Sequence, residues 1–302
     1  MAVWSDDELD GVEWGRLSHA YGAATDTPDH LRGLMSAEVE VREEALVHLF
    51  NSVLHQTTMY TAAAPVAELG ARMLEDPRFD GLDGRYGKSM REELLNFLGY
   101  VAQYATDAQI HPELAIFVSH DDLELPFMEI FGAATHIEDA VCAGRLGAGC
   151  AHRAASVIST LMPRLDSRNV GERDAALNAI ACWAALPGGA RPVSPPALEQ
   201  LRGGASDRTR ETWVRIGCVL GLVGAGADTG DLLADDSDIV RICAALSPTV
   251  AIDPRTAAMI GAALADPGEC DSWIQEIAPV PFLAGPLSVL LAEVHGRRHG
   301  AT

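Results

Sequence analysis

The segment REEALVHLF, residues 42–50, returns further along the chain as REELLNFLG, residues 91–99. Both begin with an arginine and two glutamates, and both place leucine and a second apolar residue at matching offsets. Arginine also opens three later apolar segments: RDAALNAIACW at Arg173, RETWVRIGCVL at Arg210 and RICAALSPTV at Arg241. A segment that recurs at intervals of roughly 30 to 50 residues is typical of a repeat protein.

Each of these arginines follows a short polar segment rich in Asp, Glu or Ser, which supplies helix N-caps and acidic first turns. Around the first arginine, apolar residues follow at helical spacing and predict a helix over residues 38–54. A second, less regular helix usually precedes the polar segment. Because one such pair of helices cannot bury its own apolar face, the sequence predicts that the pairs stack on one another.

An acidic turn followed by an arginine at the start of the second helix is similar to the HEAT repeat, and the similarity covers roughly residues 30–265. The N-terminal part resembles a group of actinobacterial HEAT-like proteins through WGRLSHAYG at Trp14, DTP at Asp26 and HQTTMY at His55. The resemblance implies an all-α fold, a HEAT-like (armadillo-type) α-solenoid, that is, an α–α superhelix of stacked helical hairpins. It also implies a ladder of Asp–Arg pairs between adjacent repeats: Asp166 with Arg173, Asp207 with Arg210 and Asp236 with Arg241.

We expect one domain over residues 1–302, made of parts that differ in how well they match the repeat. Residues 107–150 match it poorly, and the Pro- and Gly-rich segment at 186–196 separates two repeats. The end of the chain predicts a helix that caps the stack. The expected parts are an N-terminal cap segment (1–29), repeats (30–106), a divergent central segment (107–150), repeats (151–265) and a C-terminal capping helix (266–302).

The charge of the chain limits its partners. Its 302 residues include 43 acidic and 22 basic side chains, which gives a net charge of −21, and Lys88 is the single lysine. A field of that sign repels nucleic acid and anionic membranes and attracts a basic partner. The acidic start lacks the apolar region of a signal peptide, and the longest apolar run, from Ile216, is too short to span a bilayer. Cysteines without a CxxC pattern indicate buried, reduced thiols, and we expect a cytoplasmic protein.

The segment HQTTMY, residues 55–60, is the strongest candidate for a binding site. His48, Asn51 and His55 share one helix face beside the apolar stripe, where a solenoid would present them to a groove. Histidine and tyrosine suit recognition because they carry a polar tip on an apolar body. A second interpretation stays open, in which His55 and Gln56 cap the helix and Tyr60 packs inward. The predicted binding residues are His19, Tyr21, His48, Asn51, His55, Gln56 and Tyr60.

Patterns for catalysis and metal binding are weak, so we expect no metal and no cofactor. Neither HExxH nor GxSxG occurs, and the Gly-rich segment 221–231 lacks the lysine of a phosphate-binding loop. The densest group of potential metal ligands matches no standard zinc spacing. Its members are His120, Asp121, Asp122, His136, Glu138 and Asp139.

The sequence thus predicts a non-catalytic, protein-binding solenoid with a basic protein partner. Some HEAT-like proteins serve as immunity proteins or as partners in toxin systems, so the resemblance suggests an immunity or regulatory role for a toxin-like partner. Two alternatives remain: an enzyme that acts on a small molecule with the same scaffold, and a glycosylase for alkylated DNA. The glycosylase would use Trp183, Trp213, Arg210, Arg215 and Asp207.

Overall fold

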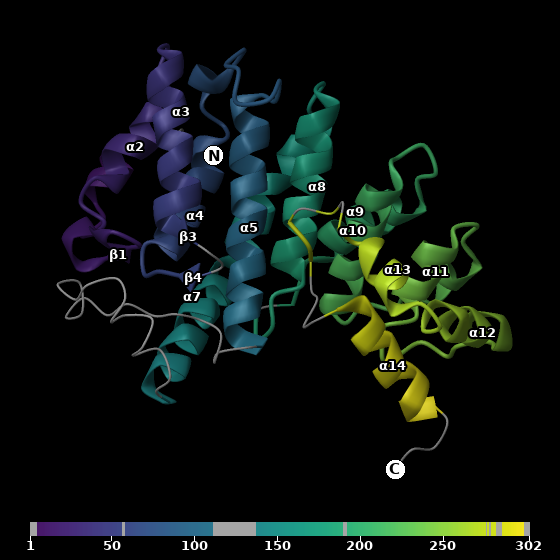
Figure 1. The fold of residues 1–302 in the computed structure, drawn as a ribbon. Helices are drawn as coiled ribbons and strands as arrows, with labels where there is room; N and C mark the ends of the chain where they lie inside the picture. Colours follow the sequence, from purple (N-terminus) through teal and green to yellow (C-terminus); the bar gives the residue numbers. More distant parts are fainter. Residues whose placement is uncertain are drawn as a thin grey trace.

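The computed structural model describes residues 5–55, 58–110, 137–189, 192–275, 277, 279–281 and 286–298. The chain is predominantly helical, as the sequence predicts (Figure 1). In the described residues, strands occur as two short antiparallel hairpins. The α-helices are α1 (Asp7–Asp10), α2 (Thr27–Gly33), α3 (Val39–His48), α4 (Ala63–Met73), α5 (Met90–Ile110), α7 (Ile137–Leu161), α8 (Val170–Ala184), α9 (Pro195–Ser206), α10 (Thr212–Gly224), α11 (Asp238–Ala244), α12 (Pro254–Ala263), α13 (Pro267–Ser272) and α14 (Leu287–Arg298).

Short 3-10 and π segments complete the helical part. The 3-10 turns are η1 (Trp14–Arg16), η3 (Pro77–Phe79), η6 (Met162–Asp166) and η7 (Gly230–Ala234), and η2 (Leu49–Val53) is a π-helical turn. The strands are β1 (Ser18–His19), β2 (Gly22–Ala23), β3 (Leu54–His55) and β4 (Thr58–Met59). None of the helices in these ranges is both long enough and apolar enough to cross a bilayer.

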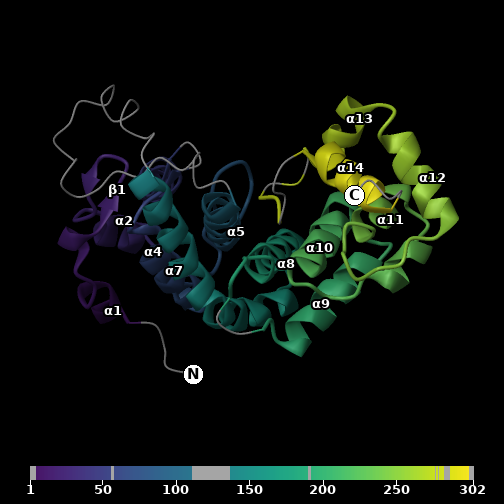
Figure 2. The same ribbon diagram turned by 90° about the horizontal axis from the view of Figure 1, so that it is seen from below.

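Helices pack mainly on helices that lie near them in sequence. α5 contacts α4, α7 and α8, while α10 contacts α8, α9 and α11. Figure 2 shows that the helices follow a curved path, with α5, α8 and α10 on its inner side. The core between them is rich in Leu, Ala and Val, and Trp183 joins α8 to α5 by donating a 2.9 Å hydrogen bond to the Leu98 carbonyl. The five described cysteines are free and buried, as expected.

The recurring arginines begin helices as predicted, with one correction. Arg42, Arg91, Arg173 and Arg241 lie in the first turn of α3, α5, α8 and α11. Arg210 precedes α10, and Arg215 takes the equivalent place in its first turn. These guanidinium groups donate to carbonyl oxygens of the segment before their own helix, where helix ends leave carbonyls without a partner. The pairs are Arg42 with Ser36, Arg91 with Leu74, Arg173 with Ser167, Arg215 with Ala205 and Arg241 with Asp235.

The expected Asp–Arg ladder is present in altered form. Asp207 pairs with Arg210 at 3.3 Å, as predicted. The other two pairings are wrong: Arg173 donates to the Ser167 carbonyl, and Arg241 donates to the Asp235 carbonyl and pairs with Asp238 in place of Asp236. The ion pairs between neighbouring helical segments include Arg210 with Asp174, Arg215 with Asp235 and Arg208 with Asp236.

The helix predicted over residues 38–54 is shorter than expected. α3 ends at His48, the chain continues through the π-helical turn η2, and β3 then pairs with β4 in the register Leu54 to Met59. His55, Thr58 and Met59 of HQTTMY therefore lie in paired strands that follow the helical turn η2. The β-branched Thr58 favours this extended backbone, a local preference that the helical periodicity of the preceding residues hides.

The central and C-terminal segments add two details to the expected division of the chain. Residues 111–136 lie outside the described residues, and α7 continues without a break through position 150, where we expected a boundary. Within 266–302, where we expected a capping helix, the described residues form α13 and α14. Before α14, residues 279–281 lie against α5 and α8: Asn178 Nδ2 donates to the Pro279 carbonyl at 2.8 Å, and Val280 N donates to Gln103 Oε1 at 2.9 Å.

Candidate functional site

The two hairpins bring together predicted residues from separate segments. Ala20 N donates to the Ser52 carbonyl at 2.9 Å, and Ala62 N donates to the Ser18 carbonyl at 3.1 Å. The β1–β2 hairpin therefore lies against η2 and against the start of the segment that joins β4 to α4. As a result, the rings of His19 and His48 are 5.1 Å apart and those of Tyr21 and His55 are 5.6 Å apart.

His19 is the buried centre of this group. Its Nδ1 accepts a hydrogen bond from the Tyr21 backbone N–H at 3.1 Å, and its Nε2 lies 2.9 Å from Asp26 Oδ1. Because Nδ1 accepts, the ring proton belongs on Nε2, which donates to the carboxylate. Burial acts to raise the pKa of Asp26, but the hydrogen bond from His19 and the neighbouring imidazoles outweigh it and lower that pKa.

His48 is buried next to His19 and stays neutral. Its Nε2 is 3.0 Å from Thr27 Oγ1, and its ring stacks on His30 with the centroids 4.1 Å apart. Burial lowers the pKa of His48 to about 4, and His30 adds to this effect while Asp26 opposes it. His48 is therefore a packed, hydrogen-bonded residue, not one that faces a partner.

The remaining predicted residues divide into exposed and buried ones. Tyr21 is 68% exposed, Asn51 is exposed, and His55 is half-buried with its Nδ1 donating to the Asn51 carbonyl at 2.9 Å. Tyr60 is buried, and desolvation raises its pKa to about 12. Gln56 lies outside the described residues. An external molecule can thus reach Tyr21, Asn51 and His55.

His19, Asp26 and His48 place their ligand atoms within 4.8 Å of one another, close enough to share a metal ion. The hydrogen bond from Tyr21 N to His19 Nδ1 argues against this use. With that nitrogen acting as acceptor, a neutral His19 carries its proton on Nε2, the atom that would have to bind the metal. The three residues fit a hydrogen-bonded structural network better than a metal site.

Residues considered for other chemistry lie apart from this group. Trp183 and Arg215 are buried in the helix packing, Arg210 is paired with Asp174, and Trp213 is half-buried. The proposed metal-ligand group falls outside the described residues, because His120, Asp121, Asp122 and His136 lie in 111–136 and the side chains of Glu138 and Asp139 are not described.

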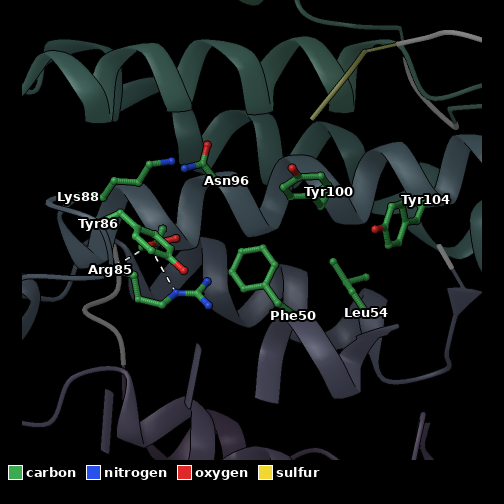
Figure 3. A pocket seen from close by; sticks show the side chains of 9 residues that line it. Phe50, Leu54, Arg85, Tyr86, Lys88, Asn96, Tyr100 and Tyr104 are labelled. Carbon is green, nitrogen blue, oxygen red and sulfur yellow. Dashed lines mark hydrogen bonds and ion pairs between the residues drawn. The ribbon is translucent and has the colours of Figure 1, made fainter. Parts of the chain in front are cut away.

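Two features near the predicted site were not found from the sequence. One is an exposed face of α3 that carries Glu40, Glu43, Glu44 and Val47 and leads to Asn51. The other is a cavity of about 370 Å³ between η2 and α5 (Figure 3). Its lining residues are Phe50, Leu54, Arg85, Tyr86, Lys88, Glu93, Asn96, Tyr100 and Tyr104. The helical spacing of Glu93, Asn96, Tyr100 and Tyr104 was a signal that could have revealed this face of α5.

No protein-family model matches the chain, and no curated protein sequence matches it.

Proposed function

We propose that this protein is a non-catalytic binding module, a HEAT-like α-solenoid that holds a basic partner protein on the exposed face of α3. The sequential packing of α4, α5, α8 and α10 and the curved path of the helices support the solenoid arrangement (Figure 2). The recurring arginines support it too, because each lies in the first turn of a helix and donates to a carbonyl of the segment before that helix. An immunity or regulatory role toward a basic, toxin-like protein is the specific form of this proposal.

The observation that carries the proposal is the character of the α3 surface. Val39, Val41 and Val47 are among the large apolar side chains exposed in the described residues, and Val47 is 46% exposed. A helix usually buries its valines, so several exposed valines on one helix indicate a contact surface.

Acidic side chains lie beside Val47 on the same face of α3. Glu40, Glu43 and Glu44 are exposed, and together with Val47 and Asn51 they follow the spacing of one helix face. Apolar contacts rimmed by charges of one sign suit a partner with basic residues around an apolar anchor. The net charge of −21 would speed the approach of such a partner over a longer distance.

The accessible part of the predicted site extends this surface. Asn51 lies one helical turn beyond Val47, and the His55 side chain binds the Asn51 carbonyl and contacts the ring of Tyr21. A tyrosine that is 68% exposed and held by a neighbouring ring offers a rigid contact at low cost in entropy. We assign Tyr21, Asn51 and His55 to the end of the partner surface.

Affinity capture from the cell lysate of the source organism, followed by mass spectrometry, tests the proposal. The wild type is compared with Glu43→Gln/Glu44→Gln, and the control Glu199→Gln/Glu269→Gln makes the same charge change on exposed acids of α9 and α13. We expect a basic protein captured by the wild type and the control, and lost with the α3 variant. Equal capture by all three, or no captured protein, would refute the proposal.

A further inference from the structure

The cavity between η2 and α5 has features that the protein-binding proposal does not use. Its volume of about 370 Å³ lies within the range of small-molecule sites, about 300 to 1,000 Å³. It lies in a groove between two helical segments, with a loop at one end (Figure 3). The cavity is separate from the α3 surface, since none of the three glutamates on that surface lines it.

Aromatic rings form much of the cavity wall. The rings of Phe50 and Tyr100 pack edge to face with their centroids 6.0 Å apart. The rings of Tyr100 and Tyr104 also pack edge to face, with their centroids 6.1 Å apart. Phe50, Tyr100 and Tyr104 are all half-buried, so each ring keeps part of its surface open. Rings that touch through their edges leave faces against which a flat apolar group can pack.

The cavity also holds cationic groups in a strongly acidic protein. The Arg85 guanidinium lies over the Phe50 ring, 5.1 Å from its centroid, and Lys88 is the single lysine of the chain. Both cations have an acidic neighbour: Arg85 Nε is 3.6 Å from Glu93 Oε1, and Lys88 Nζ is 3.7 Å from Glu92 Oε1, so these are long ion pairs. The Arg85 side chain is 26% exposed and the Lys88 side chain 42% exposed, so their terminal N–H groups stay within reach of an acid group in the cavity.

The loop that carries these cations is held in an unusual conformation. Asp83 and Ser89 pair as an isolated antiparallel β-bridge. Gly84 N donates to the Lys88 carbonyl at 2.8 Å, and this hydrogen bond closes a tight turn. At its tip Tyr86 has φ of 57° and is 94% exposed; it is the one non-glycine residue with positive φ among the described residues. A bulky residue in this region is strained, and such strain is found most often at functional sites.

We propose that this cavity binds a small, planar aromatic acid. The ring of the ligand packs against Phe50, Tyr86 and Tyr100. Its acid group accepts hydrogen bonds from Arg85 and lies within the field of Lys88. The exposed Tyr86 gains apolar contact on binding, and the Arg85 guanidinium gains a second acidic partner.

Isothermal titration calorimetry with three ligands of the same shape tests the charge preference. The probes are 2-naphthalenesulfonate, neutral 2-naphthalenemethanol and cationic 2-naphthylmethylammonium. We expect the sulfonate to bind with a Kd at least about tenfold lower than the other two. Binding of the cation as tightly as the sulfonate, or no binding of the sulfonate, would overturn the proposal.

Two variants place the bound probe in the cavity. We expect Arg85→Gln to weaken sulfonate binding by about tenfold or more and Lys88→Gln to weaken it less, with unchanged binding of the neutral probe. Arg16→Gln, a change at an exposed arginine of η1, is the control and should bind as the wild type does. If Arg85→Gln and Lys88→Gln, each shown by circular dichroism to be folded, both bind the sulfonate like the wild type, the assignment is wrong.

Discussion

Arg215→Met tests the role of the recurring arginines in joining successive helical pairs. Arg215 Nη2 donates to Asp235 Oδ2 at 2.5 Å, and Arg215 Nε donates to the Ala205 carbonyl at 3.0 Å. The two side chains of the ion pair are only 8% and 7% exposed. Methionine has a similar length and fills the space, so the change removes the hydrogen bonds and the charge without opening a large cavity.

Removal of one partner from a buried ion pair costs about 3–5 kcal/mol, because the other charge is left without compensation. We therefore expect Arg215→Met to lower the free energy of unfolding by about 3 kcal/mol or more. The double variant Arg215→Met/Asp235→Asn should recover part of this loss. Asparagine removes the carboxylate charge and still accepts the 2.8 Å hydrogen bond that Ser237 N donates to position 235.

Guanidinium denaturation, followed by both circular dichroism and tryptophan fluorescence, measures these differences. Arg16→Met is the control, since Arg16 pairs with Glu13 at the surface, and we expect a change within about 1 kcal/mol. A loss below about 1 kcal/mol for Arg215→Met, similar to that of the control, would refute the view that these buried arginines hold the helical pairs together.

Three further predictions follow from single residues. Since burial lowers the pKa of His48 from 6.5 to about 4, the unfolded chain binds more protons between these values, and stability should fall by about 3 kcal/mol from pH 7 to pH 4. His48→Gln should remove this component in pH-dependent denaturation; an unchanged pH profile would contradict it. Gly99→Ala should lower stability by about 1–3 kcal/mol, because the new methyl would lie 2.4 Å from Pro279 Cγ, while Gly203→Ala in open space should raise it by up to about 1 kcal/mol. Thermal unfolding of both compares them, and equal effects would refute the contact with Pro279. Tyr86→Gly should raise stability by about 1 kcal/mol because glycine accepts φ of 57° without strain, and a loss of stability would show that the Tyr86 side chain holds the loop.

Helix positions could be predicted from the sequence because caps, arginines and apolar spacing agree at the same sites. This agreement places Arg42, Arg91, Arg173 and Arg241 in first turns. Arg210 was misplaced because Arg215 lies only five residues later and both precede apolar residues. The choice between them depends on which side chain reaches the carbonyl of Ala205, a contact that the local sequence does not reveal.

The proximity of the site residues could be predicted only in part. Segments that share histidine and tyrosine were expected to act together, and the structure places Tyr21 against His55. The burial of His19 and His48 depends on the pairing of two hairpins, which helical periodicity does not predict. The cavity beside Phe50 combines η2 and β3 with the loop 85–88 and α5, which come after α4 in the sequence, so it becomes visible only when the helices are packed.

The most direct test of the central claim measures how tightly the captured basic partner binds. Calorimetry would compare the wild type with Glu43→Gln/Glu44→Gln at about 50 mM and about 300 mM salt, where electrostatic screening differs strongly. We predict that the variant binds at least about tenfold more weakly at low salt and that its affinity depends less on salt than that of the wild type. Equal affinity and equal salt dependence of the two proteins would show that the partner does not bind to the acidic face of α3.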